Sequence, residues 1–296
     1  MPLLGEFSAL FTAFLWSGSS LVFASATARV GAVQVNISRL ILATLYLGIV
    51  VVLFHLESSL SSRQLIYLSV SGVIGLAVGD SFLFKAYKEM GPRITMLIMS
   101  LSPALAAILG YAFLKEALSL HAIVGMIVTI VGIGIVVLQR EKNSGRVLQS
   151  TAAGFIFAFA GASGQAINLL FAKAAFNEGP IDGFLATFIR IVASLVVLIP
   201  VVILSGRWSD PIRDFTRDPK AFRLTVVGSI LGPFLGISFS LIAIANTSVA
   251  IASTLMATVP ILMLPLAHIV YKERPGWRAI AGASVAVAGV ALLFFR

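Results

Sequence analysis

The sequence contains no cysteine, only three histidines, and charged residues make up just 11% of it. The missing cysteines exclude disulfides, thiolate metal sites and cysteine nucleophiles. His55, His121 and His268 lie far apart and show neither a His-Glu-x-x-His pattern nor another metal-ligand spacing. We therefore expect no metal, no cofactor and no catalytic residues.

Apolar residues, in contrast, make up 59% of the chain, and its mean hydropathy is +1.03. Such values are typical of membrane proteins and lie outside the range of soluble domains. A bilayer core about 30 Å thick requires roughly 20 apolar residues per helix. Ten segments qualify, and we predict an all-α integral membrane protein with ten transmembrane helices at 7–28, 35–54, 65–84, 94–114, 121–138, 151–172, 184–204, 224–244, 250–270 and 279–295.

The two halves of the chain are copies of one another. Residues 75–136 match residues 232–293 at a constant offset of 157. The match consists of glycines, prolines and a charged pair, which hydrophobic sequences do not share by chance. The paired residues are Gly75 and Gly232, Gly79 and Gly236, Phe82 and Phe239, Met99 and Met256, Pro103 and Pro260, Lys115-Glu116 and Lys272-Glu273, Gly125 and Gly282, and Gly132 and Gly289.

Each copy contains five predicted spans, so the second copy enters the membrane from the opposite side. We thus expect two inverted five-helix repeats, at 1–140 and 151–296, joined by a cytoplasmic linker at 141–150. Fifteen Lys and Arg residues lie in the odd-numbered connections, and only four lie in the even-numbered connections and at the termini. Because cytoplasmic loops are rich in Lys and Arg, both termini are predicted to face outward.

The net charge of +9 follows from these loops. The basic residues are divided among short connections and do not gather on one soluble face, so we interpret the charge as a topological signal and expect no nucleic-acid partner. The predicted location is a bacterial or archaeal plasma (inner) membrane. The sequence gives no indication of the oligomeric state.

The doubled arrangement of a proline within the fourth span, a Lys-Glu pair twelve residues later and a glycine-spaced fifth span resembles the EamA-like permeases of the drug/metabolite transporter superfamily. The match rests on Pro103, Glu116, Gly125 and Gly132, on their counterparts Pro260, Glu273, Gly282 and Gly289, and on Arg39 and Arg190. The resemblance covers almost the whole chain. It implies alternating-access transport of small organic metabolites, often outward. Members of this family are commonly drawn with cytoplasmic termini, which departs from the orientation that the loop charge predicts here.

Charged residues inside the predicted spans are the first candidates for function, because charge within a membrane is costly. Arg39 and Asp80 lie about one turn inside the same membrane face and are placed to pair. Arg190 is the counterpart of Arg39, whereas Ile237 stands where the repeat would place a second acid. A structural bridge or a snorkelling arginine is one interpretation. The other is that Arg190, with only Glu178 and Asp182 nearby in sequence, attracts an anion such as a carboxylate, while Asp80 exchanges a proton.

Polar residues in the first and sixth spans form a second group of candidates. Trp16 and Ser20 lie near the middle of the first span, and Gln165 and Asn168 share a face of the sixth at i, i+3 spacing. They either bond neighbouring helices or line a cavity for a polar metabolite.

The remaining candidates occur in both repeats. Pro103 and Pro260 are predicted near the middle of their spans, as fixed kinks or as hinges. Met99 and Met256 precede them by one turn, as core filling or as an adaptable cavity wall. Glu116 and Glu273 are interpreted as interfacial anchors or gate contacts. The glycine rows fit static packing or sliding contacts.

We therefore predict a secondary transporter, and specifically an exporter, of small organic metabolites such as amino acids or amphipathic compounds. Its two inverted halves would alternate access to one site, with proton coupling or exchange. Its partners would be the substrate, the lipid bilayer and protons. An intramembrane enzyme or a channel is the alternative, although the sequence contains no catalytic or filter motif.

Overall fold

The computed structural model describes residues 3–56, 60–139, 152–206, 211–262, 265 and 276–294. In these ranges the chain forms helices and connecting turns, so the all-α prediction is confirmed. Six segments are long and apolar enough to cross a membrane, and four shorter apolar helices accompany them. The predicted linker at 141–150 and the gate candidate Glu273 lie outside the described residues.

The described residues of the first half form six α-helices and one π-helix. They are α1 (Leu4–Val30), α2 (Ala32–Leu53), α3 (Ser62–Gly72), η1 (Val73–Gly79), α4 (Asp80–Met99), α5 (Ser102–Leu114) and α6 (Leu120–Gln139).

In its described residues, the second half follows this order with two differences: it adds the short helix α9, and the counterpart of α4 is divided into α11 and α12. Its elements are α7 (Ala152–Asn177), α8 (Gly183–Leu204), α9 (Pro211–Arg217), α10 (Pro219–Ser229), η3 (Ile230–Gly236), α11 (Ile237–Asn246), α12 (Val249–Met256) and α14 (Trp277–Phe294).

The 157-residue offset holds for the backbone as well as for residue identities. It carries α3 onto α10 and η1 onto η3, end to end, and it aligns the starts of α4 and α11. Each π-helix ends with the same wide hydrogen bond, from Asp80 N–H to the Gly75 carbonyl and from Ile237 N–H to the Gly232 carbonyl. Short π-helical segments are rare and concentrate at functional sites. A matched pair therefore marks the two equivalent places where the helices depart from regular geometry.

The fourth and ninth predicted spans differ from the sequence expectation. Pro103 does not kink one long helix: α4 ends at Met99, and Pro103 lies in the first turn of α5. The helix likewise ends at Met256 before Pro260. Proline has no N–H to donate to the carbonyl four residues earlier, but it fits the first helical turn, where no such donor is needed. Each of these spans is therefore broken one turn before its proline.

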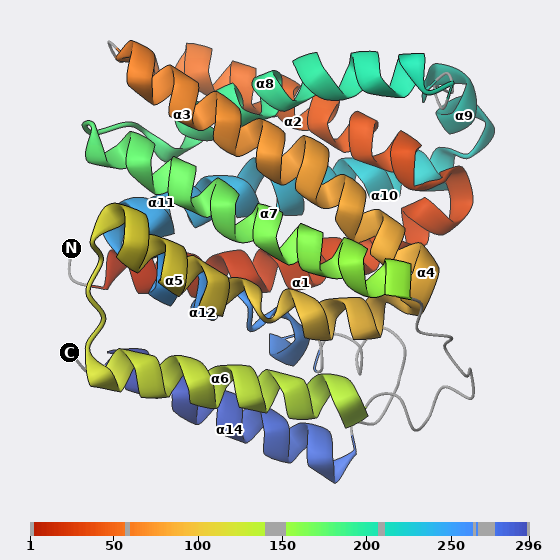
Figure 1. Cartoon of the computed structure of the whole chain (residues 1–296). Coiled ribbons are helices and arrows are strands. Elements are labelled where there is room, and N and C mark those ends of the chain that lie inside the picture. The colour runs from red at the N-terminus through yellow and green to blue at the C-terminus, as the bar shows by residue number, and fades with distance from the viewer. Residues whose placement is uncertain are drawn as a thin grey trace.

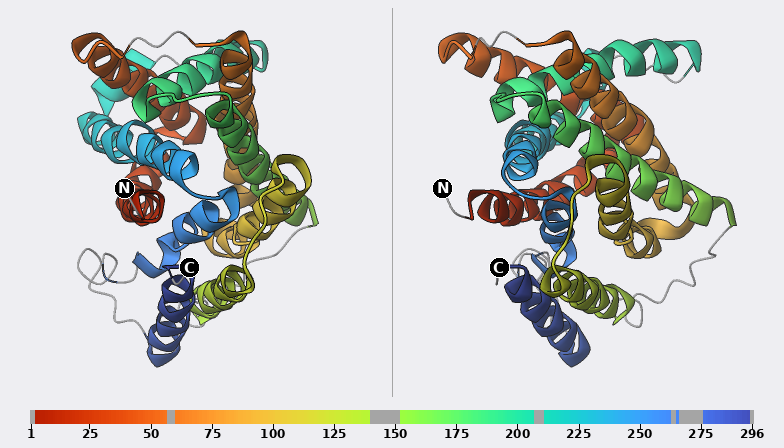
Figure 2. Two further views of the ribbon diagram at one scale, coloured as in Figure 1. Left: turned by 90° about the vertical axis from the view of Figure 1, so that its left-hand side faces the viewer. Right: turned by 60° about the vertical axis from the view of Figure 1, so that its left-hand side comes forward.

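Figure 1 shows the helices running between two ends of the molecule, with both termini at the same end, here called the N/C end. α1 runs away from the N/C end, and α7 runs toward it. The pair α6 and α14 lies to one side of the other helices in all three views (Figures 1 and 2). There Gly132 approaches Ala286 so closely that a methyl group would lie 2.4 Å from the Ala286 nitrogen.

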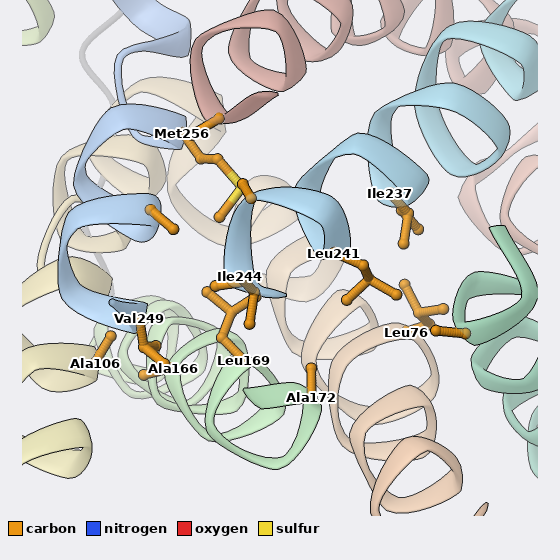
Figure 3. Packing of buried hydrophobic residues seen from close by; sticks show 14 of the residues in the cluster. Leu76, Ala106, Ala166, Leu169, Ala172, Ile237, Leu241, Ile244, Val249 and Met256 are labelled. Carbon is orange, nitrogen blue, oxygen red and sulfur yellow. The ribbon is translucent and has the colours of Figure 1, made fainter. Parts of the chain in front are cut away.

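The apolar core lies between the two halves. Figure 3 shows Leu76 of η1 and Ala106 of α5 in one cluster with Leu169 of α7 and Leu241 of α11. Many large apolar side chains point outward instead, among them Ile49, Val52 and Ile127. An apolar outer surface of this kind is suited to lipid.

Candidate functional site

The first helix of each half crosses the π-helix of the other half. On one side, α1 packs on η3: a methyl group on Gly236 would lie 2.5 Å from Nε1 of Trp16, and one on Gly232 would lie 3.1 Å from the Phe23 ring. Trp16, a predicted cavity residue, is thus a contact between the halves. Only a residue without a side chain permits this approach.

On the other side, α7 packs on η1 in the equivalent way. A methyl group on Gly75 would lie 2.8 Å from the Asn168 amide carbon. Asn168 is the counterpart of Phe23 when the first helices are aligned at an offset of 145 residues. The same crossing is therefore apolar where Phe23 fills it and polar where Asn168 does.

Arg190 binds Asn168 at this polar crossing. Its Nη2 donates to Oδ1 of Asn168 over 2.7 Å, and the Asn168 amide in turn donates to the backbone and side-chain oxygens of Gln165 at 2.9 and 3.0 Å. The Ser71 hydroxyl of α3 donates to the Asn168 carbonyl over 2.6 Å. The predicted cavity residues Gln165, Asn168 and Arg190 consequently form one hydrogen-bonded chain, and the first half contacts it through Ser71.

The counterpart Arg39 has a different set of partners. It forms an ion pair with Asp80 and donates through Nε to Asn36 over 2.9 Å. Its guanidinium also lies 5.5 Å from the centre of the Phe23 ring, within cation–π range. Arg39 and Asp80 therefore do pair.

Arg190 has no carboxylate within ion-pair distance among the described residues, and its Nε is buried without a hydrogen-bond partner. The acids nearest to it in sequence serve elsewhere. Glu178 faces Arg63 at 3.7 Å, and Asp182 accepts hydrogen bonds from Phe184 N–H and Leu185 N–H at the start of α8. Asp80 and Arg190 influence each other electrostatically, without a direct hydrogen bond or ion pair.

The other sequence candidates occupy less distinctive places. The Ser20 hydroxyl donates to the carbonyl of Ser17 within its own helix, over 2.9 Å. Met99 lies beside Gly161, where a methyl group would be 3.4 Å from its sulfur. Met256 is buried in the apolar core (Figure 3).

A second charged cluster holds the break between α11 and α12, near the N/C end. Lys173 of α7 donates to the carbonyls of Ile244 and Thr247 at 2.9 and 3.0 Å, and so binds the end of α11. Glu116 accepts from the N–H of Val249 over 2.9 Å and binds the start of α12. A cation at a helix C-terminus and an anion at an N-terminus both oppose the helix dipole and are stabilising.

Glu6 completes this cluster. It is buried and accepts the Thr247 hydroxyl over 3.1 Å. We call Glu6, Glu116, Lys173 and Thr247 the clasp. Glu6 and Glu116 belong to the first half, and Lys173 and Thr247 to the second, so the clasp ties the halves together.

Sequence reasoning found only Glu116 in this cluster. Lys173 fell just beyond the predicted span at 151–172, whereas α7 extends to Asn177 and places it inside a helix. A lysine and a glutamate inside apolar helices are the signal that could have indicated the clasp. The contact itself joins residues that are distant in sequence.

At the opposite end the tie between the halves is exposed. Arg29, in the last turn of α1, donates to Asp218 over 2.7 Å just before α10. This hydrogen bond is the main cause that holds the pKa of Asp218 below its usual value. Exposed pairs of this kind contribute little stability.

Two further features bear on chemistry. No group of three His, Asp or Glu residues in the described parts of the chain is placed to hold a metal. An apolar pocket of about 450 Å³ opens between α3, α5 and α7, and its lining contains none of the predicted site residues; it is formed by Tyr67, Leu109, Phe113, Leu114, Ile167, Leu170, Phe171 and Ala174.

The sequence profile of the EamA-like transporter family matches this chain twice, over residues 3–138 and 152–295. The chain belongs to the EamA-like transporter family. This membership and the long apolar helices make it an integral membrane protein of a transporter family.

Two known proteins are similar to this chain. A Bacillus subtilis (strain 168) protein described as the uncharacterized transporter YxxF is 26% identical over 121 residues, which span 41% of this EamA protein and 37% of the relative. A solved structure titled only as the crystal structure of a protein matches with a TM-score of 0.78 at 18% identity and covers 97% of this chain and 94% of that chain. The second likeness shows the fold.

Proposed function

We propose that this protein is a secondary transporter that exports small organic metabolites, such as amino acids or amphipathic compounds, by alternating access between two inverted five-helix halves. The six long apolar segments and four shorter ones together match the ten predicted spans. α1 and α7, the first helices of the two halves, run in opposite directions (Figure 1). Both observations support ten spans in inverted repeats.

The reciprocal crossing of α1 on η3 and α7 on η1 is the observation that carries this proposal. Two similar halves that hold each other through equivalent contacts can exchange conformations, and the exchange opens one central site to either side. The contacts are made by glycines, so the helices meet backbone to side chain without interlocking. Such contacts allow one half to rotate against the other.

In this conformation the N/C end is the more firmly closed one. The clasp joins the halves there through hydrogen bonds that involve the buried Glu6 and Thr247. The exposed pair between Arg29 and Asp218 is the corresponding tie at the opposite end. We propose that release of the clasp opens the N/C end.

The placement of Asp80 supports proton coupling or exchange. This carboxylate pairs with Arg39 and also interacts with Arg190 through space. A carboxylate that is influenced by two arginines can change partner, or take up a proton, when the halves move. We propose this role for Asp80, in a plasma (inner) membrane with both termini outside.

Transport is tested with purified protein in proteoliposomes. We expect uptake of at least one labelled amino acid or amphipathic metabolite that saturates, that unlabelled compound competes with, and that is accelerated by substrate on the other side of the membrane. Protein-free liposomes are the control. Flux that does not saturate would favour a channel, and conversion of the compound into a new chemical species would favour an enzyme. If an imposed pH gradient does not change the flux, the proposed role of Asp80 in proton coupling is refuted, whereas the transport function is not.

A further inference from the structure

The charges of Arg39 on α2, Asp80 on α4 and Arg190 on α8 do not balance. Two guanidinium groups, Arg39 and Arg190, interact with one carboxylate, Asp80, and only Arg39 is directly paired with it. The repeat puts Ile237 where a second acid would stand beside Arg190. Within the described residues, the second half therefore lacks the counter-ion that the first half has.

Arg190 nevertheless lies in a built polar site. Only 3% of its surface is exposed, one donor is satisfied by the Asn168 amide, and Nε has no partner. A buried donor without an acceptor costs free energy, and more so when it is charged. The Ser194 hydroxyl donates to the Arg190 carbonyl over 2.6 Å, so the main chain here is held as well.

The site lies at the boundary between the halves. Arg190, Asn168 and Gln165 belong to the second half, whereas Gly72 and Gly75 of the first half cover them. Movement of the halves would therefore uncover Arg190. An anion could then reach the free donor, and closure would bury the anion with it.

We propose that Arg190 is the receptor for a carboxylate group of the transported metabolite, and that Gln165 and Asn168 position it. The substrate carboxylate gives Arg190 the negatively charged partner that Asp80 gives Arg39. A planar guanidinium fits the two oxygens of a carboxylate with directed hydrogen bonds. The substrate class is thus small monocarboxylates, amino acids included, and this assignment rests on the transport function proposed above.

The test compares carboxylates with their own primary amides, which keep the shape and lose the charge. The probes are L-leucine and L-leucinamide, L-phenylalanine and L-phenylalaninamide, and benzoate and benzamide, with inorganic phosphate as a further anion. Binding is measured as thermal stabilisation of the protein in nanodiscs. We expect at least one carboxylate to bind about 10- to 100-fold more tightly than its amide, as the loss of a charged hydrogen bond implies.

Arg190→Gln should abolish this preference, and Arg190→Lys should retain part of it. Arg63→Gln is the matched control, because it removes an arginine that is exposed and paired with Glu178. If Arg190→Gln fails to fold, Ile237→Asp keeps Arg190 and installs the missing counter-ion, and it should likewise abolish the preference. Leu241→Asp, one turn along α11, controls for a buried acid as such.

Three results would overturn the proposal: equal binding of carboxylates and amides by the wild type, stabilisation by phosphate but by no carboxylate, or a preference that survives in both Arg190→Gln and Ile237→Asp. Measured transport in proteoliposomes distinguishes failure of the Arg190 proposal from failure of the proposed transport function. Wild-type protein that transports amides or amines without a carboxylate preference remains a transporter and refutes only the role of Arg190.

Discussion

Gly72 sets the distance between α3 and α8 beside Arg190. A methyl group on Gly72 would lie 2.2 Å from the Arg190 carbonyl oxygen, which is backbone and cannot turn aside. Asn168 and Ser71 depend on the same close approach, because their hydrogen bonds join α7 to α3 and α8. At the scale of single residues, the polar site exists because one position has no side chain.

Gly72→Ala should therefore separate α3 from α8 and destabilise the protein by about 1–3 kcal/mol, the usual cost of overpacking a tight site. Gly48→Ala is the matched control, because its methyl group would meet the Phe188 ring at an ordinary 3.7 Å. Thermal unfolding of both variants in the same detergent provides the comparison. Equal midpoints for the two variants would contradict the close contact.

At the scale of elements, the break between α11 and α12 is held by side chains from other helices. Lys173 comes from α7, Glu116 follows α5, and Glu6 comes from α1. Ser248 adds a local cap by accepting from Ile251 N–H over 3.3 Å. The cap by Ser248 and the bonds from Lys173 lie within the second half, whereas Glu6 and Glu116 come from the first half and can hold the break only while the halves are together at the N/C end.

Loss of the clasp should expose the break. In Glu116→Gln or Lys173→Met, we expect a cysteine introduced as Ala250→Cys to react several-fold faster with a water-soluble maleimide, because Ala250 is 1% exposed in the closed arrangement. The chain has no cysteine of its own, so the label reports one position. Glu178→Gln, a charge change at the same end outside the clasp, should leave the rate unchanged. An unchanged rate in both clasp variants would mean that the clasp does not close this end.

The sequence predicted elements better than contacts. Glycine, proline and charge at the 157-residue offset indicated the repeat, and the helix bounds follow the same offset. Pro103 was predicted inside one continuous span, as a kink or a hinge, whereas the helix ends before it, because a proline signal alone does not distinguish a kink from a helix start. The bonds from Arg190 to Asn168 and from Glu116 to Val249 N–H required the tertiary structure, since they join residues 22 and 133 positions apart.

At the scale of the whole molecule, the two ends differ in charge and in closure. The described parts of the basic connections include Arg29 and Arg213, at the end away from the termini. The clasp closes the N/C end, which loop charge predicts to face outward. If the termini do face outward, the outer end is the shut one, as the proposed export function requires of a state that loads from inside. Among the described residues, the exposed ion pair of Arg29 and Asp218 joins the halves at the opposite end.

This orientation can be tested with the cysteine-free chain. Ser62→Cys lies at the start of α3 near the N/C end, and Thr216→Cys lies in α9 at the opposite end; both positions are exposed. In intact bacterial cells, a membrane-impermeant maleimide should label Ser62→Cys at once, and Thr216→Cys only after the cells are opened. The reverse pattern would place the termini in the cytoplasm. It would also make the clasp an inner gate. The conformation described here would then be closed toward the cytoplasm and would take up substrate from outside. The labelling result therefore decides whether this conformation is suited to export or to uptake.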